Sequence, residues 1–85
     1  MDQKTKEILN EFSNFLAKHL PHTKKHDLKD VEIGKYALNE FRVSYEVFIN
    51  KQRQIIYFDI REIMENHNKF SHLLPSAIDQ LIIHA

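Results

Sequence analysis

Residues 41 to 49 alternate between side chains of two kinds, and this alternation constrains the fold more than any other feature of the sequence. Successive side chains of a β-strand point to opposite faces, so a period of two sorts the residues between the two faces of a sheet. One of the two sets is entirely apolar: Phe41, Val43, Tyr45, Val47 and Ile49. The pattern therefore predicts a strand with one face in the hydrophobic core.

A second strand is predicted directly after the first. Residues 55 to 60 are β-branched or aromatic apart from one aspartate, and these residue types favour strands. The polar residues 50 to 54 between the two strands predict an antiparallel hairpin. Because neither Lys51 nor Gln52 favours the positive φ of a two-residue turn, we expect a longer loop or a bulge at this hairpin.

A third strand is predicted over residues 31 to 38, before the other two. A tight turn at residues 39 and 40 sets three pairs opposite each other and keeps the apolar face continuous: Leu38 with Phe41, Tyr36 with Val43, and Gly34 with Tyr45. A shift of one residue would move every side chain to the other face, so this agreement supports a three-stranded antiparallel meander.

Helical periodicity is found on both sides of the predicted sheet. Between Asp2 and Leu20 an apolar stripe recurs at helical spacing, and Pro21 ends that helix. After the strands, Asp59 and Glu62 have the spacing of a capping box, which predicts a short helix from residue 60 to residue 67. Ser76 is the expected N-cap of a last helix that extends to the end of the chain.

These elements predict one small α+β domain over residues 1–85. Its order is an N-terminal helix, a three-stranded antiparallel meander sheet and one or two C-terminal helices, in two layers. The stripe of the first helix is expected to pack against residues of the sheet and of the turn into the second helix: Tyr36, Phe41, Val43, Tyr45, Val47, Ile49, Ile56, Phe58 and Ile60.

The composition excludes several classes of function. Twelve Lys and Arg residues balance twelve Asp and Glu residues, so no global field attracts nucleic acid. There is no cysteine and a single glycine, which excludes disulfides, thiolate metal sites and glycine-rich phosphate loops. No apolar run approaches the roughly 18 residues of a membrane span. We expect a cytoplasmic protein without a cofactor, without a membrane partner and without catalytic activity.

Two weaker patterns lie in the connection after the first helix. Lys24, Lys25 and Lys29 make it locally basic, which leaves open a phosphate contact and a weak nucleic-acid-binding function, although a solvated loop is favoured. His19, His22 and His26 have spacings that could converge on a metal ion, with Asp27 or Asp30 as a further ligand. A small metal-dependent enzyme is thus a further alternative, while solvated histidines are favoured and no metal site is predicted.

The second face of the predicted sheet carries the main functional hypothesis. Four apolar residues, Ile33, Phe48, Ile55 and Tyr57, are expected there beside Arg42, Ser44, Glu46 and Asp59. Open antiparallel sheets usually present polar residues on such a face, so either the C-terminal helix covers it or it contacts another protein. We expect a non-enzymatic protein-binding module, such as a small regulator, adaptor or inhibitor, that forms a homodimer. The predicted partner-binding residues are Ile33, Arg42, Glu46, Phe48, Ile55 and Tyr57.

Overall fold

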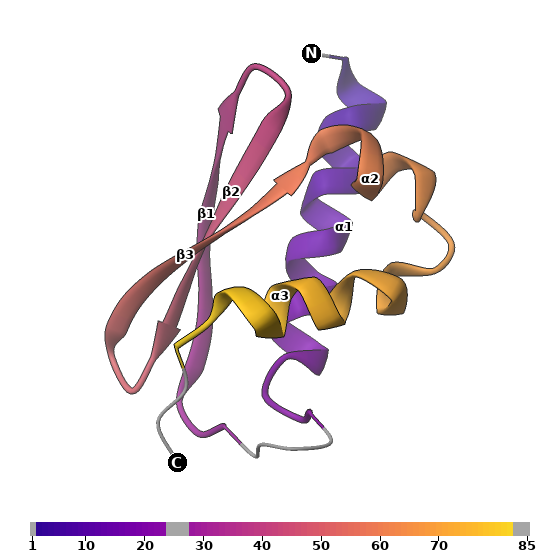
Figure 1. Cartoon of the computed structure of the whole chain (residues 1–85). Helices are drawn as coiled ribbons and strands as arrows, with labels where there is room; N and C mark the ends of the chain where they lie inside the picture. Colours follow the sequence, from indigo (N-terminus) through magenta and orange to yellow (C-terminus); the bar gives the residue numbers. More distant parts are fainter. Residues whose placement is uncertain (1, 24–27, 83–85) are drawn as a thin grey trace.

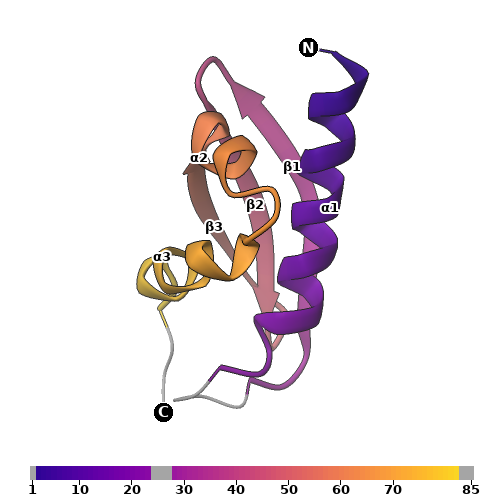
Figure 2. The same cartoon turned by 90° about the vertical axis from the view of Figure 1, so that its right-hand side faces the viewer.

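The computed structural model describes residues 2–23 and 28–82 and confirms the predicted α+β fold (Figure 1). Its sheet is antiparallel, with the strand order β1-β2-β3. The helices lie together on one side of this sheet, which gives the two expected layers (Figures 1 and 2). The elements are α1 (Gln3–His19), β1 (Val31–Asn39), β2 (Arg42–Ile49), β3 (Gln52–Asp59), α2 (Ile60–Glu65), the 3-10 helix η1 (Phe70–Leu73) and α3 (Leu74–Gln80).

The first helix begins and ends as its sequence predicts. Asp2 is the N-cap, and its carboxylate accepts a hydrogen bond from the backbone N–H of Thr5 at 2.8 Å. Hydrogen bonds from the side chain and backbone of Thr5 lower the pKa of Asp2. The helix ends at His19, with Leu20 as its C-cap before Pro21, and buries the predicted stripe, which includes Leu9 and Phe12.

An aromatic cluster fixes α1 on the sheet. The ring of Phe12 packs edge-to-face against two rings of the sheet. The ring centres are 5.5 Å apart for Tyr45 of β2 and 5.0 Å apart for Phe58 of β3. The hydroxyl of buried Tyr45 donates to the backbone carbonyl of Leu9 at 2.9 Å, which ties the sheet to the helix backbone. Burial also raises the pKa of the Tyr45 hydroxyl. Around this cluster, the predicted core residues Val43, Val47, Ile49 and Ile56 are buried, and Tyr36 and Ile60 are partly buried.

The β2–β3 hairpin differs from the expected long loop. Ile49 pairs with Gln52, so the loop is the two residues Asn50 and Lys51, with φ of 51° and 67°. Two consecutive positive φ values are the signature of the type I′ turn, whose twist matches that of the flanking strands. Asn50 tolerates this conformation well, whereas Lys51 adopts it at a steric cost that the paired strands on either side offset.

The β1–β2 hairpin has a register two residues away from the predicted one. Leu38 pairs with Val43 and Tyr36 with Tyr45, and the two-residue loop is Glu40 and Phe41. Because the shift is even, Tyr36 stays on the core face. Phe41, in contrast, lies in the turn with 76% of its surface exposed, so its predicted place in the core is wrong.

The C-terminal helices also depart from the prediction. Asp59 precedes α2 as expected, but its side chain makes no capping hydrogen bond. The last helix begins at Leu74 rather than after Ser76, because η1 leads into it and Pro75 occupies its first turn. It ends at Gln80, and Leu81 is extended with ψ of 142°. In the described ranges, the model contains no helix that is both apolar and long enough for a membrane span.

Lys51→Gly is expected to raise the free energy of unfolding by about 1 kcal/mol, because glycine adopts a positive φ without the steric cost that lysine has. Urea denaturation measures the change. Gln52→Gly is the matched control: it lies in β3 without a positive φ and should lower stability instead. A loss of stability in the Lys51 variant would contradict the strain at this turn.

Tyr45→Phe is expected to lower the free energy of unfolding at neutral pH by about 1 kcal/mol, because it removes the hydrogen bond to Leu9. The variant should also be less sensitive to alkali. Since the folded state raises the pKa of Tyr45, the folded chain retains a proton that the unfolded chain loses, so stability falls as the pH rises above about 10. Urea denaturation at neutral pH and above pH 10 tests this; equal alkaline losses in both proteins would contradict it.

Candidate functional site

The sheet has an open face, which we define as the strand residues that point away from the helices. The elements on the other side share one core: α1 contributes Phe12, α2 contributes Ile63, and α3 contributes Ala77. In residues 2–23 and 28–82 no helix crosses to the open face (Figure 2), so the described part of the C-terminal helix does not cover it. The strand pairing places these residues there: Glu32, Gly34, Ala37, Asn39, Arg42, Ser44, Glu46, Phe48, Arg53, Ile55, Tyr57 and Asp59.

Five of the six predicted partner-binding residues lie on the open face, and Ile33 does not. Ile33 pairs with Val47, and Tyr36 pairs with Tyr45, so three steps along β1 match two steps along β2. The extra residue is a β-bulge, which reverses the alternation on one side of it. Ile33 therefore packs partly buried against the core, and its assignment to the contact face is wrong. That assignment assumed a regular strand.

Gly34 lies in this bulge and leaves room for two open-face side chains. A Cβ atom at this position would be 2.9 Å from Oε1 of Glu46 and 3.0 Å from Cε2 of Phe48. Both distances are shorter than van der Waals contact, so Glu46 and Phe48 lie directly against the backbone of β1. A glycine inside a strand often marks such a close approach or a bulge, and the single glycine of the chain was the sequence signal for it.

Two diagonal contacts organise the charges of the open face. The Nε atom of Arg53 donates to Oε2 of Glu46 at 2.6 Å. At the other end, the guanidinium of Arg42 lies over the ring of Tyr57, 5.5 Å from its centre. Ion pairs exposed to this degree add at most about 1 kcal/mol to stability. Their main consequence is geometric, because each contact holds an arginine beside large side chains of the same surface.

The apolar part of the open face is partly accessible. Tyr57 exposes 49% of its surface, and Phe48 and Ile55 are half-buried by their neighbours in the sheet. Tyrosine and arginine are the residue types that most often dominate the binding energy of protein interfaces. The open face brings both residue types together with the apolar side chains of Phe48 and Ile55.

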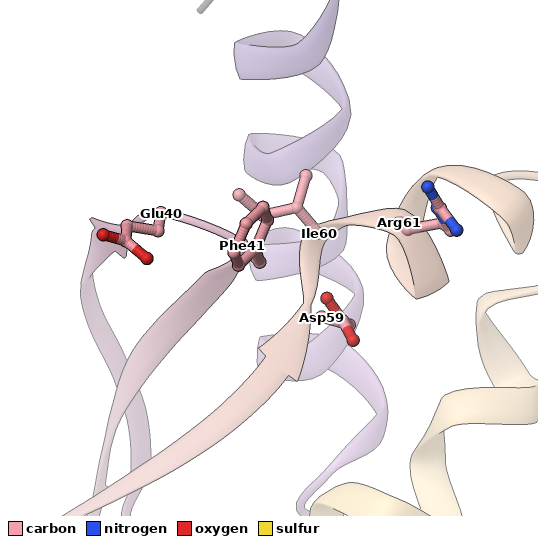
Figure 3. A pocket seen from close by; sticks show the side chains of 5 residues that line it. All are labelled: Glu40, Phe41, Asp59, Ile60 and Arg61. Atoms are coloured by element: carbon pink, nitrogen blue, oxygen red, sulfur yellow. The ribbon is translucent and has the colours of Figure 1, made fainter.

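A second exposed feature, which the sequence did not predict, lies at the end of this face. Phe41 occupies the tip of the β1–β2 hairpin, and its carbonyl accepts a hydrogen bond from the N–H of Ile60 at 2.8 Å. With Glu40, Asp59 and Arg61, these two residues line a shallow hollow of about 490 Å³ (Figure 3). Asp59 belongs to both regions, so the tip borders the open face.

The basic and histidine-rich connection is described only in part. Lys24, Lys25 and His26 lie outside the described residues, and Lys29 is exposed. His19 is exposed, and the centre of its ring lies 4.5 Å from the centre of the Phe15 ring. Within the described ranges, no three His, Asp or Glu side chains gather closely enough to hold a metal ion. The structure therefore does not bring the predicted histidines together among the residues it places.

The open face is thus a sheet surface that no described helix covers and on which Tyr57 is exposed. Asp2 and Tyr45, whose pKa values are shifted, lie outside it. Its function has to be inferred from its residues, because comparisons with protein-family models, curated proteins and solved structures find no match for this chain.

Proposed function

We propose that this chain is a non-enzymatic protein-binding module that contacts its partner through the open face, and that a second copy of the chain is such a partner. The observation that carries the proposal is the position of Phe48, Ile55 and Tyr57 on a face that no described helix covers. An uncovered antiparallel sheet normally carries polar residues instead. A module of this kind acts by occupying a surface of its partner, as a small regulator, adaptor or inhibitor does.

The charges of the open face favour a second copy. Arg42 and Arg53 are positive, and Glu32, Glu46 and Asp59 are negative, so both signs are interspersed on one surface. A two-fold axis brings the same surface of two copies together, and a surface with both signs can then place opposite charges against each other. A partner with a single sign of charge, such as nucleic acid, finds no matching field on this face.

The size of the chain supports the same partner. A domain of this length removes only a little over ~60% of its unfolded surface from water, which leaves it with a small core. Contact between two open faces would bury the exposed part of Tyr57 and the remaining surface of Phe48 and Ile55. Association would therefore add apolar burial that one copy cannot provide alone.

Tyr57→Ser is expected to weaken self-association at least ten-fold, which corresponds to about 1.4 kcal/mol. The substitution removes the ring beneath Arg42, while the backbone hydrogen bonds of residue 57 remain. Sedimentation equilibrium over a range of concentrations measures the dissociation constant. Phe41→Ser is the matched control, because Phe41 is a more exposed aromatic residue that lies in the hairpin tip.

Two outcomes would contradict the proposal. A wild-type protein that stays monomeric up to about 1 mM, where even weak complexes form, would remove the second copy as a partner. A larger loss of association in the Phe41 variant than in the Tyr57 variant would move the contact to the hairpin tip. Circular dichroism of both variants establishes that each retains the fold during the measurement.

A further inference from the structure

The outer edge of β3 is closed by a side chain. β3 is the last strand of the sheet, and such an edge presents backbone N–H and C=O groups that another strand can pair with. At Tyr57 both groups are occupied by the amide of Gln80. Its Oε1 accepts from the Tyr57 N–H at 2.7 Å, and its Nε2 donates to the Tyr57 carbonyl at 2.9 Å. The amide thus makes the two hydrogen bonds that a residue of a neighbouring strand would make.

A second amide attaches the chain beyond α3 to the same strand. Nε2 of Gln54 donates to the carbonyl of Ile82 at 3.0 Å, and the N–H of Ile82 donates to Oε1 of Gln54 at 2.7 Å. Ala77, before the first attachment, and Leu81, between the two, are buried in the core. We call the segment from Leu74 to Ile82 the C-terminal clasp. It lies beside the edge of β3 in both views (Figures 1 and 2).

The C-terminal clasp combines apolar packing by Leu74, Ala77, Ile78 and Leu81 with hydrogen bonds at exposed positions. Its helix has seven residues, which is too short to be stable without packing, since isolated helices below about 12 residues are marginal in water. The side chain of Ile82 is 67% exposed, and the amide hydrogen bonds of Gln54 and Gln80 are at exposed positions. A short segment with exposed hydrogen bonds can open locally at a lower free-energy cost than the whole domain.

We infer that Gln80 blocks strand pairing at the edge of β3, and that release of the C-terminal clasp exposes this edge to β3 of a second copy. Backbone groups of alternate residues point to the same side of a strand. Because the groups of Tyr57 point outward to Gln80, those of Ile55 and Arg53 point outward as well. The edge then offers a regular row of donors and acceptors to a second strand.

The sequence of β3 is complementary to itself in one antiparallel register. With a two-fold axis at Ile55, this residue lies opposite its own copy, and Arg53 lies opposite Tyr57 of the second copy on both sides. Arginine over a tyrosine ring is a favourable pair, and Arg42 already makes such a contact with Tyr57 within one chain. No like charges lie opposite each other at these three positions, and this complementarity favours a second copy as the occupant.

The other edge of the sheet does not offer the same opportunity. β1 contains the bulge between Ile33 and Tyr36, and exposed Lys35 lies within it. Bulges and lysines are the devices by which natural proteins keep edge strands from pairing. β3 pairs with β2 without interruption from Gln52 to Asp59 and is therefore the regular edge. This inference does not rest on the proposed function, because pairing at the edge and contact through the open face use different groups.

Gln80→Ala tests the inference. The variant is expected to self-associate at least ten-fold more tightly than the wild type in sedimentation equilibrium. In dilute solution its Tyr57 amide should exchange with deuterium about ten-fold faster, because its acceptor is lost. At high concentration the amides of both Ile55 and Tyr57 should become protected. Gln52→Ala, at an exposed position at the start of the same strand, is the matched control and should change neither quantity.

A proline at residue 55 identifies the edge as the origin of the added association. Ile55→Pro removes an N–H that points away from β2 and leaves the pairing with β2 in place, as proline does on edge strands. Ile55→Pro also removes the isoleucine side chain from the open face. The variant is therefore measured alone and together with Gln80→Ala, so that this second effect on association is determined separately. The inference predicts that proline abolishes the increase caused by Gln80→Ala. An increase that survives proline, or no increase and no concentration-dependent protection of the Ile55 amide, would overturn it.

Discussion

The contact of Phe12 with Tyr45 and Phe58 holds the helix layer on one side of the sheet, and the rest of the structure depends on this arrangement. The Tyr45 hydroxyl reinforces it, because the hydrogen bond to the carbonyl of Leu9 allows a polar group to be buried at the centre of the core. A chain of this length has enough apolar residues for one core, and α2, η1 and α3 all contribute to that same core. No described helix remains to cover the second side of the sheet. The open face is therefore a direct consequence of how the single core is assembled.

The alternation of residues 41 to 49 predicted the buried side of β2 correctly, because the direction of a side chain in a strand is a local property. Pairing between strands is not local, and there the predictions failed. A shift of two residues keeps every side chain on its face, so nothing in the apolar pattern opposed the wrong register that placed Phe41 in the core. The positive φ of Lys51 is a similar case, since the twist of two paired strands outweighed the preference of one residue.

The candidate site was predictable in part for the same reason. Arg42, Glu46, Phe48, Ile55 and Tyr57 belong to the regular pair of strands and share the face that their sequence positions indicate. Ile33 belongs to β1, where the bulge shifts the alternation, and the bulge accommodates Glu46 and Phe48 against Gly34. The close approach of Glu46 and Phe48 to Gly34 joins two strands, and a local sequence pattern does not predict contacts between strands. The only sequence signal for it was the glycine itself. The amide contacts of Gln54 and Gln80 left no sequence signal, because glutamine at those positions reads as an ordinary exposed residue.

The two edges of the sheet and its open face bear together on the proposed association of this chain. A regular strand edge supplies backbone hydrogen bonds to a second strand, and the side chains along the edge decide which register and which partner are favoured. In β1 the bulge and Lys35 interrupt such an edge, whereas in β3 the side chain of Gln80 occupies the backbone groups of Tyr57. Among the described residues, the exposed large apolar side chains are Tyr57 on the open face, Leu38 and Phe41 at the β1–β2 hairpin, and Ile82 in the C-terminal clasp. Contact with another protein through these surfaces would depend on their side chains, which can discriminate between partners.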